Sequence, residues 1–142
     1  MPNRPSRPSI APLLVLVLAL AASACGSGAP LSPSDLALLT TTDSFSGTLA
    51  IGATAVHPFV GKTAGTITLT LTAVGPDSAT RLGLGLGTWD GATCAVQLST
   101  TDAAVTMAYQ ASISSPGNYC VSLTDPGRLT GDTTYTVQVI HP

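Results

Sequence analysis

Apolar and polar residues alternate along most of the chain that follows Phe45, and no helical periodicity longer than a turn or two interrupts them. The clearest case is the segment 65–74, in which threonine occupies four alternate positions. Because successive side chains of a strand point to opposite faces, this period of two predicts a half-buried strand with a threonine face toward water. The residues expected on its buried face are Ile67, Leu69, Leu71 and Ala73.

A second segment, 80–88, repeats the alternation with leucine on one face and glycine on the other. Glycine offers no side chain to pack and normally weakens a strand. A face made of glycine therefore predicts close approach by another part of the chain, or a strongly curved strand. The leucines are Leu82, Leu84 and Leu86, and the glycines are Gly83, Gly85 and Gly87.

Six further segments predict short strands, and clusters of Pro, Gly, Asp and Ser between them predict turns. Strands at this spacing are typical of sandwiches in which each sheet buries one face. We expect an all-β fold, an antiparallel β-sandwich of jelly-roll type with about eight strands, whose order the pattern leaves open. The six segments are 45–51, 56–60, 93–99, 105–112, 118–123 and 134–140.

The N-terminal pattern differs from the rest of the chain. Arg4 and Arg7 precede an almost wholly apolar stretch over residues 10–22, and small residues follow it. A basic start, a short apolar core and a small-residue cleavage site are typical of a secretory signal. The alternative is a retained transmembrane helix, but the stretch has about 13 residues where a span needs roughly 20.

The residues Ala22-Ser23-Ala24-Cys25 resemble the bacterial lipobox, in which small residues precede a lipid-acceptor cysteine. Ala22 stands where that motif usually has leucine. The resemblance implies that Cys25 carries lipid and anchors an exported protein to the cell membrane or the outer membrane. The alternative is cleavage after Ala24, which would release a soluble protein with a free Cys25. We expect a lipoprotein signal peptide at 1–24, the lipidated cysteine and a flexible Gly/Ser/Pro linker at 25–43, and one domain at 44–142.

Composition narrows the function classes. Hydrophobic residues make up 44% of the 142 residues and charged residues 8%, whereas globular proteins average about 25% charged residues. That balance excludes a solvated disordered chain, which needs high charge and low hydrophobicity. The formal net charge is −2 and no basic patch exists, so a nucleic-acid partner is excluded on electrostatic grounds.

The chain has three cysteines, and lipidation of Cys25 leaves Cys94 and Cys120, both on predicted strands. In an exported chain an oxidising compartment is expected, so we predict that these two form a structural disulfide. Two cysteines lack the paired spacing of a zinc site, and the absence of a Cys-x-x-Cys motif disfavours a redox role. We expect no metal and no cofactor.

Six short elements follow one another along the domain: SGTL (46–49), HPFV (57–60), AGTITL (64–69), the Leu/Gly strand (82–86), PGNYCV (116–121) and TYTVQV (134–139). Together they resemble the bacterial pre-peptidase C-terminal (PPC) domain. The resemblance implies a jelly-roll sandwich that accompanies a protease or attaches to substrate, and that in some collagenases binds collagen with calcium. This sequence departs from that setting, because it holds no protease motif and no clustered acidic loop. Calcium is an alternative only if Asp125 and Asp132 converge from one loop.

No catalytic motif is present. The sequence has no Gly-x-Ser-x-Gly elbow, no His-Glu-x-x-His and no phosphate-binding loop, and it contains no glutamate. We therefore expect that the protein is not an enzyme. The weaker alternative is a hydrolase in which His57 acts with an aspartate.

Trp89 and Asp90 lie at the end of a predicted strand, beside a turn. We expect the tryptophan to cap one end of the core, and the alternative is that the pair contacts a sugar ring or a peptide. From the anchor, the linker and the missing catalytic groups we predict a non-catalytic binding or accessory module of the cell envelope, with a glycan, a peptide or an envelope protein as its partner. The alternative is a structural or assembly lipoprotein that docks on an envelope protein.

Overall fold

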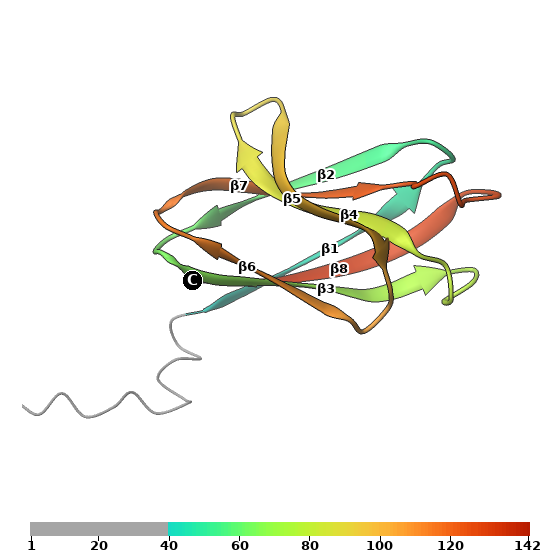
Figure 1. Cartoon of the computed structure of the whole chain (residues 1–142), viewed down its shortest axis with the longest axis horizontal. Helices are drawn as coiled ribbons and strands as arrows, with labels where there is room; N and C mark the ends of the chain where they lie inside the picture. The colour runs from blue at the N-terminus through green and yellow to red at the C-terminus, as the bar shows by residue number, and fades with distance from the viewer. Residues whose placement is uncertain (1–39) are drawn as a thin grey trace, which may run out of the picture. The chain divides into compact units, whose positions relative to one another are not determined.

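The structure is a computed structural model that describes residues 40–142. The predicted signal peptide, Cys25 and the predicted linker up to residue 39 lie outside the described residues. The described part folds into eight strands and contains no helix (Figure 1). The strands are β1 (Thr41–Leu49), β2 (Thr54–Gly61), β3 (Gly65–Gly75), β4 (Leu82–Trp89), β5 (Cys94–Ala103), β6 (Ala108–Ile113), β7 (Gly117–Thr124) and β8 (Thr133–His141).

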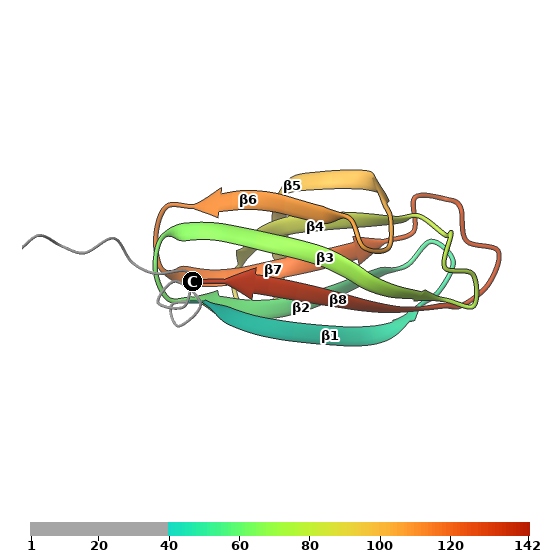
Figure 2. The same ribbon diagram turned by 90° about the horizontal axis from the view of Figure 1, so that it is seen from below.

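The strands form two antiparallel four-stranded sheets, with the orders β1-β8-β3-β6 and β2-β7-β4-β5. β1 pairs with β8, β2 with β7, β3 with β6 and β4 with β5, as if one long hairpin had been rolled up. That nesting defines the jelly roll, so the predicted all-β sandwich of jelly-roll type is confirmed. Figure 2 shows the layers from the side, with β1 and β2 at one open edge and β5 and β6 at the other.

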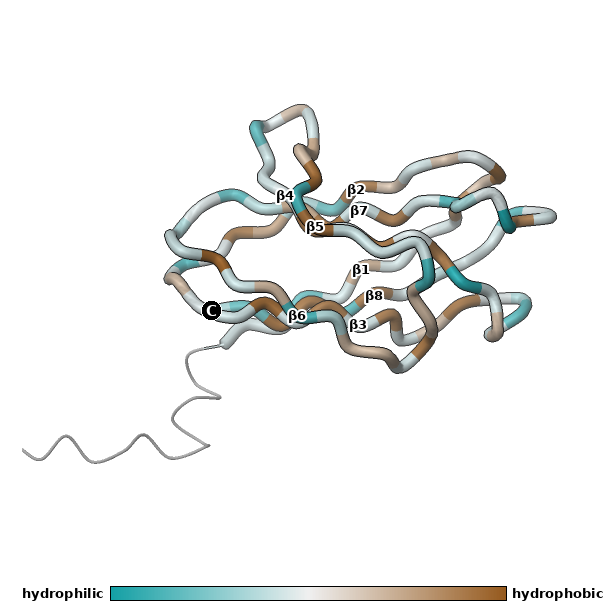
Figure 3. Tube along the Cα trace, viewed as in Figure 1, coloured by the Kyte–Doolittle hydropathy of each residue, from teal (hydrophilic) through white to brown (hydrophobic). Residues whose placement is uncertain are grey.

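The core fills the space between the two sheets. Leu71, Val137 and Val139 on the first sheet and Val121 and Leu123 on the second are fully buried. Burial of each such side chain contributes about 1.5–3 kcal/mol relative to exposure. Figure 3 shows that hydrophobic and hydrophilic residues follow one another along the strands. Residues 40–142 contain no helix with the length and hydropathy of a membrane span.

Several predicted strand limits differ from the structure, most of all at β1, β5 and β6. β5 continues to Ala103, beyond the predicted end at residue 99. β1 begins at Thr41, so residues 41–43 of the predicted linker belong to the domain, where Asp43 pairs with Val139 of β8. β1 ends at Leu49, and Ile51 lies in the following turn with 61% of its surface exposed. β6 begins only at Ala108. Strand ends depend on pairing with distant strands, which local alternation does not report.

A register shift corrects the predicted buried face of β3. Leu71 pairs with Val137, but Ala73 pairs with Thr136, so an extra residue stands opposite β8 at this point. A bulge of this kind reverses the alternation beyond it. Ala73 is therefore exposed and Val74 is buried, contrary to the prediction that Ala73 shares the face of Leu71.

Candidate functional site

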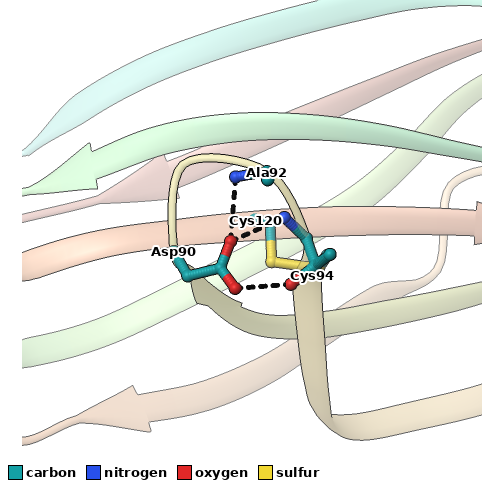
Figure 4. The surroundings of a disulfide bond; sticks show 5 residues. Asp90, Ala92, Cys94 and Cys120 are labelled. Atoms are coloured by element: carbon teal, nitrogen blue, oxygen red, sulfur yellow. Dashed lines mark hydrogen bonds between the residues drawn. A yellow bond between two sulfur atoms is a disulfide. The ribbon is translucent and has the colours of Figure 1, made fainter.

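The start of β5 crosses over the outer face of its own sheet. Cys94 of β5 forms a disulfide with Cys120 of β7, as predicted, and the two Cα atoms are 5.8 Å apart (Figure 4). β4 lies between these strands in the sheet. Strands two places apart are separated by roughly 9.5 Å within a sheet. The short Cα separation therefore means that β5 has left the plane of the sheet and lies above β4.

The glycine face of β4 makes room for this crossing. A Cβ atom on Gly87 would meet the backbone of Ala95 and would lie 2.8 Å from the Cα of Val96. A Cβ atom on Gly85 would lie 2.9 Å from a methyl group of Val96. The predicted close approach of another segment is thus confirmed, and the segment is β5. Two register shifts along the β4–β5 pair supply the coiling that carries β5 across.

Trp89 and Asp90 lie at the tip of this β4–β5 hairpin. Trp89 is half-buried and pairs with Cys94. Asp90 Oδ1 accepts hydrogen bonds from the backbone N–H groups of Ala92 and Thr93, and its Oδ2 accepts one from the Thr93 hydroxyl, at 2.8, 2.6 and 2.6 Å. These bonds, led by the one from the Thr93 side chain, lower the pKa of Asp90 to about 2. The carboxylate therefore holds its own turn together, and contact of this pair with a ligand stays a prediction.

The sequence did not single out an apolar hollow that opens between the edges of β5 and β6. These two strands belong to different sheets and do not pair with each other. Between them lies a cavity of about 130 Å³ with an apolar floor made by Leu69, Leu84 and Leu86. Leu98 of β5 and Tyr109 of β6 form its two sides, and Leu98 is 52% exposed.

A second cavity of about 240 Å³ adjoins the first along the same edge. Both cavities are lined by Leu86, Leu98 and Ala111, so they form one cleft, which we call the β5–β6 cleft. No charged residue lines it. The polar groups that line it are neutral amides and hydroxyls from the two strands and the Tyr119 ring, namely Gln97, Ser99, Thr100, Tyr109, Gln110, Ser112 and Tyr119.

The opposite edge of the sandwich is filled by ring side chains. His57 of β2 points between the sheets and stacks on Phe45 of β1, with ring centroids 4.9 Å apart. Its Nε2 shares a hydrogen bond of 2.8 Å with the hydroxyl of Tyr135. Burial lowers the pKa of His57 and raises the pKa of Tyr135. Among residues 40–142 no carboxylate contacts His57, so the predicted His57–aspartate pair is not assembled.

A second histidine, His141, pairs with an aspartate that the sequence placed in the linker. His141 Nε2 lies 3.1 Å from Asp43 Oδ2, and the imidazole, almost fully buried, packs on Phe59 at a centroid distance of 4.9 Å. The two residues stand 98 positions apart and meet only because β1 pairs with β8. No local signal in the sequence could have linked them.

The acidic loop residues serve backbone turns. Asp125 accepts hydrogen bonds from the backbone N–H groups of Gly52, Gly127, Arg128 and Leu129, and these bonds, led by the one from Gly52, lower its pKa. Within the described part of the chain, no group of three or more His, Cys, Asp or Glu residues is placed to hold a metal ion. The Asp125 carboxylate therefore organises its own loop.

Comparison with known proteins identifies no family for this chain. No family model matches the chain, and no curated protein matches it. One solved structure that it is similar to is the crystal structure of PliG from Aeromonas hydrophila, a periplasmic lysozyme inhibitor of g-type lysozyme. The TM-score is 0.44 at 14% sequence identity, over 70% of this chain and 84% of that chain. A similarity of this size carries no inference about function.

Proposed function

We propose that the protein is a non-catalytic binding module of the cell envelope, and that its β5–β6 cleft holds an extended, uncharged polypeptide segment with apolar side chains. The observation that carries the proposal is the cleft itself. Core leucines reach the surface there, and Leu98 at its side is half-exposed. An exposed apolar surface of this kind is typical of a binding site.

The lining of the cleft favours a neutral ligand. Leucine side chains form the floor, and glutamines and hydroxyls, without any charge, form the sides. A charged ligand group would lose its hydration here and gain no counter-charge, which is unfavourable. A glycan is less favoured, because the only tryptophan lies at the hairpin tip and does not line the cleft.

The shape of the cleft favours a strand rather than a compact molecule. Each side is the free edge of a sheet, and its backbone N–H and C=O groups can pair with a partner segment. Because β5 is interrupted by register shifts and β6 has only six residues, the segment must be short, and a long regular strand is not accommodated. The two cavities adjoin each other along that edge, so side chains at alternate positions of a bound strand can enter them. Peptide recognition by strand addition uses this combination, with affinity from the backbone and specificity from the pockets.

Two further parts of the proposal rest on the sequence. Cys25 carries lipid and tethers the exported domain to a membrane through the linker, which the small residues before Cys25 and the signal pattern support. The domain is PPC-like, which is supported by the six ordered sequence elements and by the jelly-roll topology that this resemblance implied.

A panning experiment tests the function of the cleft. We expect a phage-displayed heptapeptide library, panned on the full chain, to yield uncharged peptides with apolar residues at alternate positions. Leu98→Asn places an amide between the two cavities, and we expect it to abolish retention of those phage. Val96→Asn is the matched control, because Val96 lies on the same strand with 46% exposure and lines neither cavity.

The two variants make the result decisive. Both must keep the circular dichroism of the parent protein. Enrichment of charged or patternless peptides, or equal retention by both variants, would show that the cleft does not bind an extended segment. If chitotriose instead binds and shifts amide NMR signals of the parent but not of Leu98→Asn, the ligand of the cleft is a glycan and not a peptide.

A further inference from the structure

The four edge strands of the sandwich are not equally protected against pairing with another strand. β2 carries Pro58 in its middle, β5 contains two register shifts, and β6 has only six residues. Proline, bulges and short length are the devices by which proteins block edge-to-edge association. β1 has none of them, because its nine residues pair with β8 in one unbroken register.

The free edge of β1 also lacks hydrogen-bonding partners within the chain. Apart from the ladder with β8, no backbone group of Thr41–Leu49 hydrogen-bonds to another described residue. Its one charged residue is Asp43, which already contacts His141. Phe45, in the middle of the strand, is only partly buried by its stacking on His57. This edge is therefore long, regular and nearly neutral, and it exposes part of an aromatic ring.

We propose that β1 pairs antiparallel with β1 of a second copy of this chain, so that the two β1-β8-β3-β6 sheets join into one continuous sheet. Full overlap of Thr41–Leu49 about a two-fold axis places residues opposite one another whenever their numbers add to 90. Phe45 then lies opposite Phe45 of the second copy. Two-fold closure uses the β1 edge of each copy, so association through β1 stops at a dimer.

The side chains of β1 are complementary to themselves in this register. On the inner face, Asp43 lies opposite Gly47, so no two like charges meet, and the two Phe45 rings cover each other. On the outer face, Ser44 lies opposite Ser46 and Thr42 opposite Thr48, which are pairs of neutral hydroxyls. Aromatic pairs and hydroxyl pairs stabilise facing strands, whereas like charges directly opposite destabilise them. This self-complementarity selects a second copy rather than an unrelated strand, and it is independent of the β5–β6 cleft.

A charge-reversal series tests the dimer. We expect sedimentation velocity of the full chain, in density-matched detergent and over a concentration series, to give twice the chain mass. Ser44→Lys with Ser46→Lys sets ammonium groups directly opposite each other across the two-fold axis, and we expect a monomer. A mixture of that protein with the Ser44→Glu and Ser46→Glu double variant restores opposite charges, and we expect a heterodimer.

The control places the same charges on the same face but away from the edge. Thr68→Lys with Thr70→Lys lies on β3, whose two sides are already paired with β6 and β8. We expect this variant to remain a dimer, with both lysine variants keeping the circular dichroism of the parent. A monomeric parent chain at every concentration, an unchanged mass for the Ser44/Ser46 lysine variant, or equal dissociation of the Thr68/Thr70 variant would overturn the proposal.

Discussion

Small residues set how closely two strands of this protein approach each other. Gly85 and Gly87 lie under β5, where a side chain would meet the backbone of Ala95 or the side chain of Val96. Ser122 of β7 points to the same outer face and is nevertheless buried, which is consistent with the cover that β5 provides. At these positions the absence of side-chain atoms determines the path of the chain more than any attractive contact does.

Gly87→Ala should therefore destabilise the fold. The added methyl group meets backbone atoms of β5, which cannot rotate away, and we expect a loss of about 1–3 kcal/mol in the free energy of unfolding. Gly131→Ala is the matched control, because nothing lies within 4 Å of its added Cβ, and its change should stay within about 0.5 kcal/mol. Urea unfolding measures both values. Equal unfolding free energies for the two variants would mean that β5 does not lie in close contact with Gly87.

His57 makes the stability of the fold depend on pH. Its neutral ring stacks on Phe45 and hydrogen-bonds with Tyr135, and burial lowers its pKa in the folded state below the ordinary value of 6.5. The unfolded chain therefore binds a proton first as the pH falls. The contribution of His57 is complete above pH 6.5 and is lost as the pH falls from there through the lower folded pKa.

The non-titrating variant His57→Gln tests this dependence. We expect its unfolding free energy to fall less than that of the parent between pH 7.5 and pH 5.5, as followed by chemical denaturation at each pH. His141 is present in both proteins, so the difference isolates His57. An identical pH dependence for the two proteins would contradict the assignment.

At the scale of the elements, the β4–β5 hairpin is the part that departs most from a regular sandwich. Its tip is closed by the hydrogen bonds of Asp90, and its return strand is held over β4 by the disulfide (Figure 4). β5 is consequently drawn across the outer face, and its Leu98 side chain forms one side of the cleft. We infer that the disulfide maintains both the crossing and the width of the cleft.

Removal of the disulfide should weaken the fold measurably. Cys94→Ala with Cys120→Ala opens a loop of 26 residues, and the chain-entropy model gives a loss of about 3.5 kcal/mol in the free energy of unfolding. Urea unfolding of the parent with and without dithiothreitol provides the control. The reductant should lower the stability of the parent and leave the double variant unchanged. A double variant as stable as the oxidised parent would contradict the prediction.

At the scale of the whole molecule, the rolled hairpin gives the two open edges different properties. The β1–β2 edge is filled by His57, His141 and the phenylalanine rings beside them, and it leaves β1 free to pair. The β5–β6 edge is hollow and apolar. The proposed dimer through β1 carries two β5–β6 clefts and can hold two ligand segments at once, and lipids at Cys25 would keep both at a membrane surface.

The proposed anchor predicts where the protein is found in the cell. Cys25→Ala removes the acceptor sulfur and with it the acyl chains, each CH₂ of which contributes about 0.8 kcal/mol to membrane attachment. We expect this variant in the soluble fraction or as an uncleaved precursor. The Cys94→Ala and Cys120→Ala double variant keeps Cys25 and should stay with membranes. Unchanged membrane fractionation of Cys25→Ala would exclude lipidation at this residue.

Local alternation in the sequence predicted all eight strands, because side-chain burial in a strand follows a period of two. The cysteine count, with Cys25 assigned to the lipobox, indicated the Cys94–Cys120 disulfide by elimination. The glycine face of β4 predicted a close neighbour or a strongly curved strand. The alternation failed at Ala73, since a bulge depends on the partner strand and leaves no mark in the local pattern.

The tertiary structure alone decided the features that depend on strands far apart in the chain. The contact of His141 with Asp43, the β5–β6 cleft and the unprotected edge of β1 all follow from the order in which the strands are paired. Alternation in the sequence indicates which face of each strand is buried, but it does not indicate which strands are neighbours. Strand order is set by the packing of the whole chain, and so are the sites that form between strands.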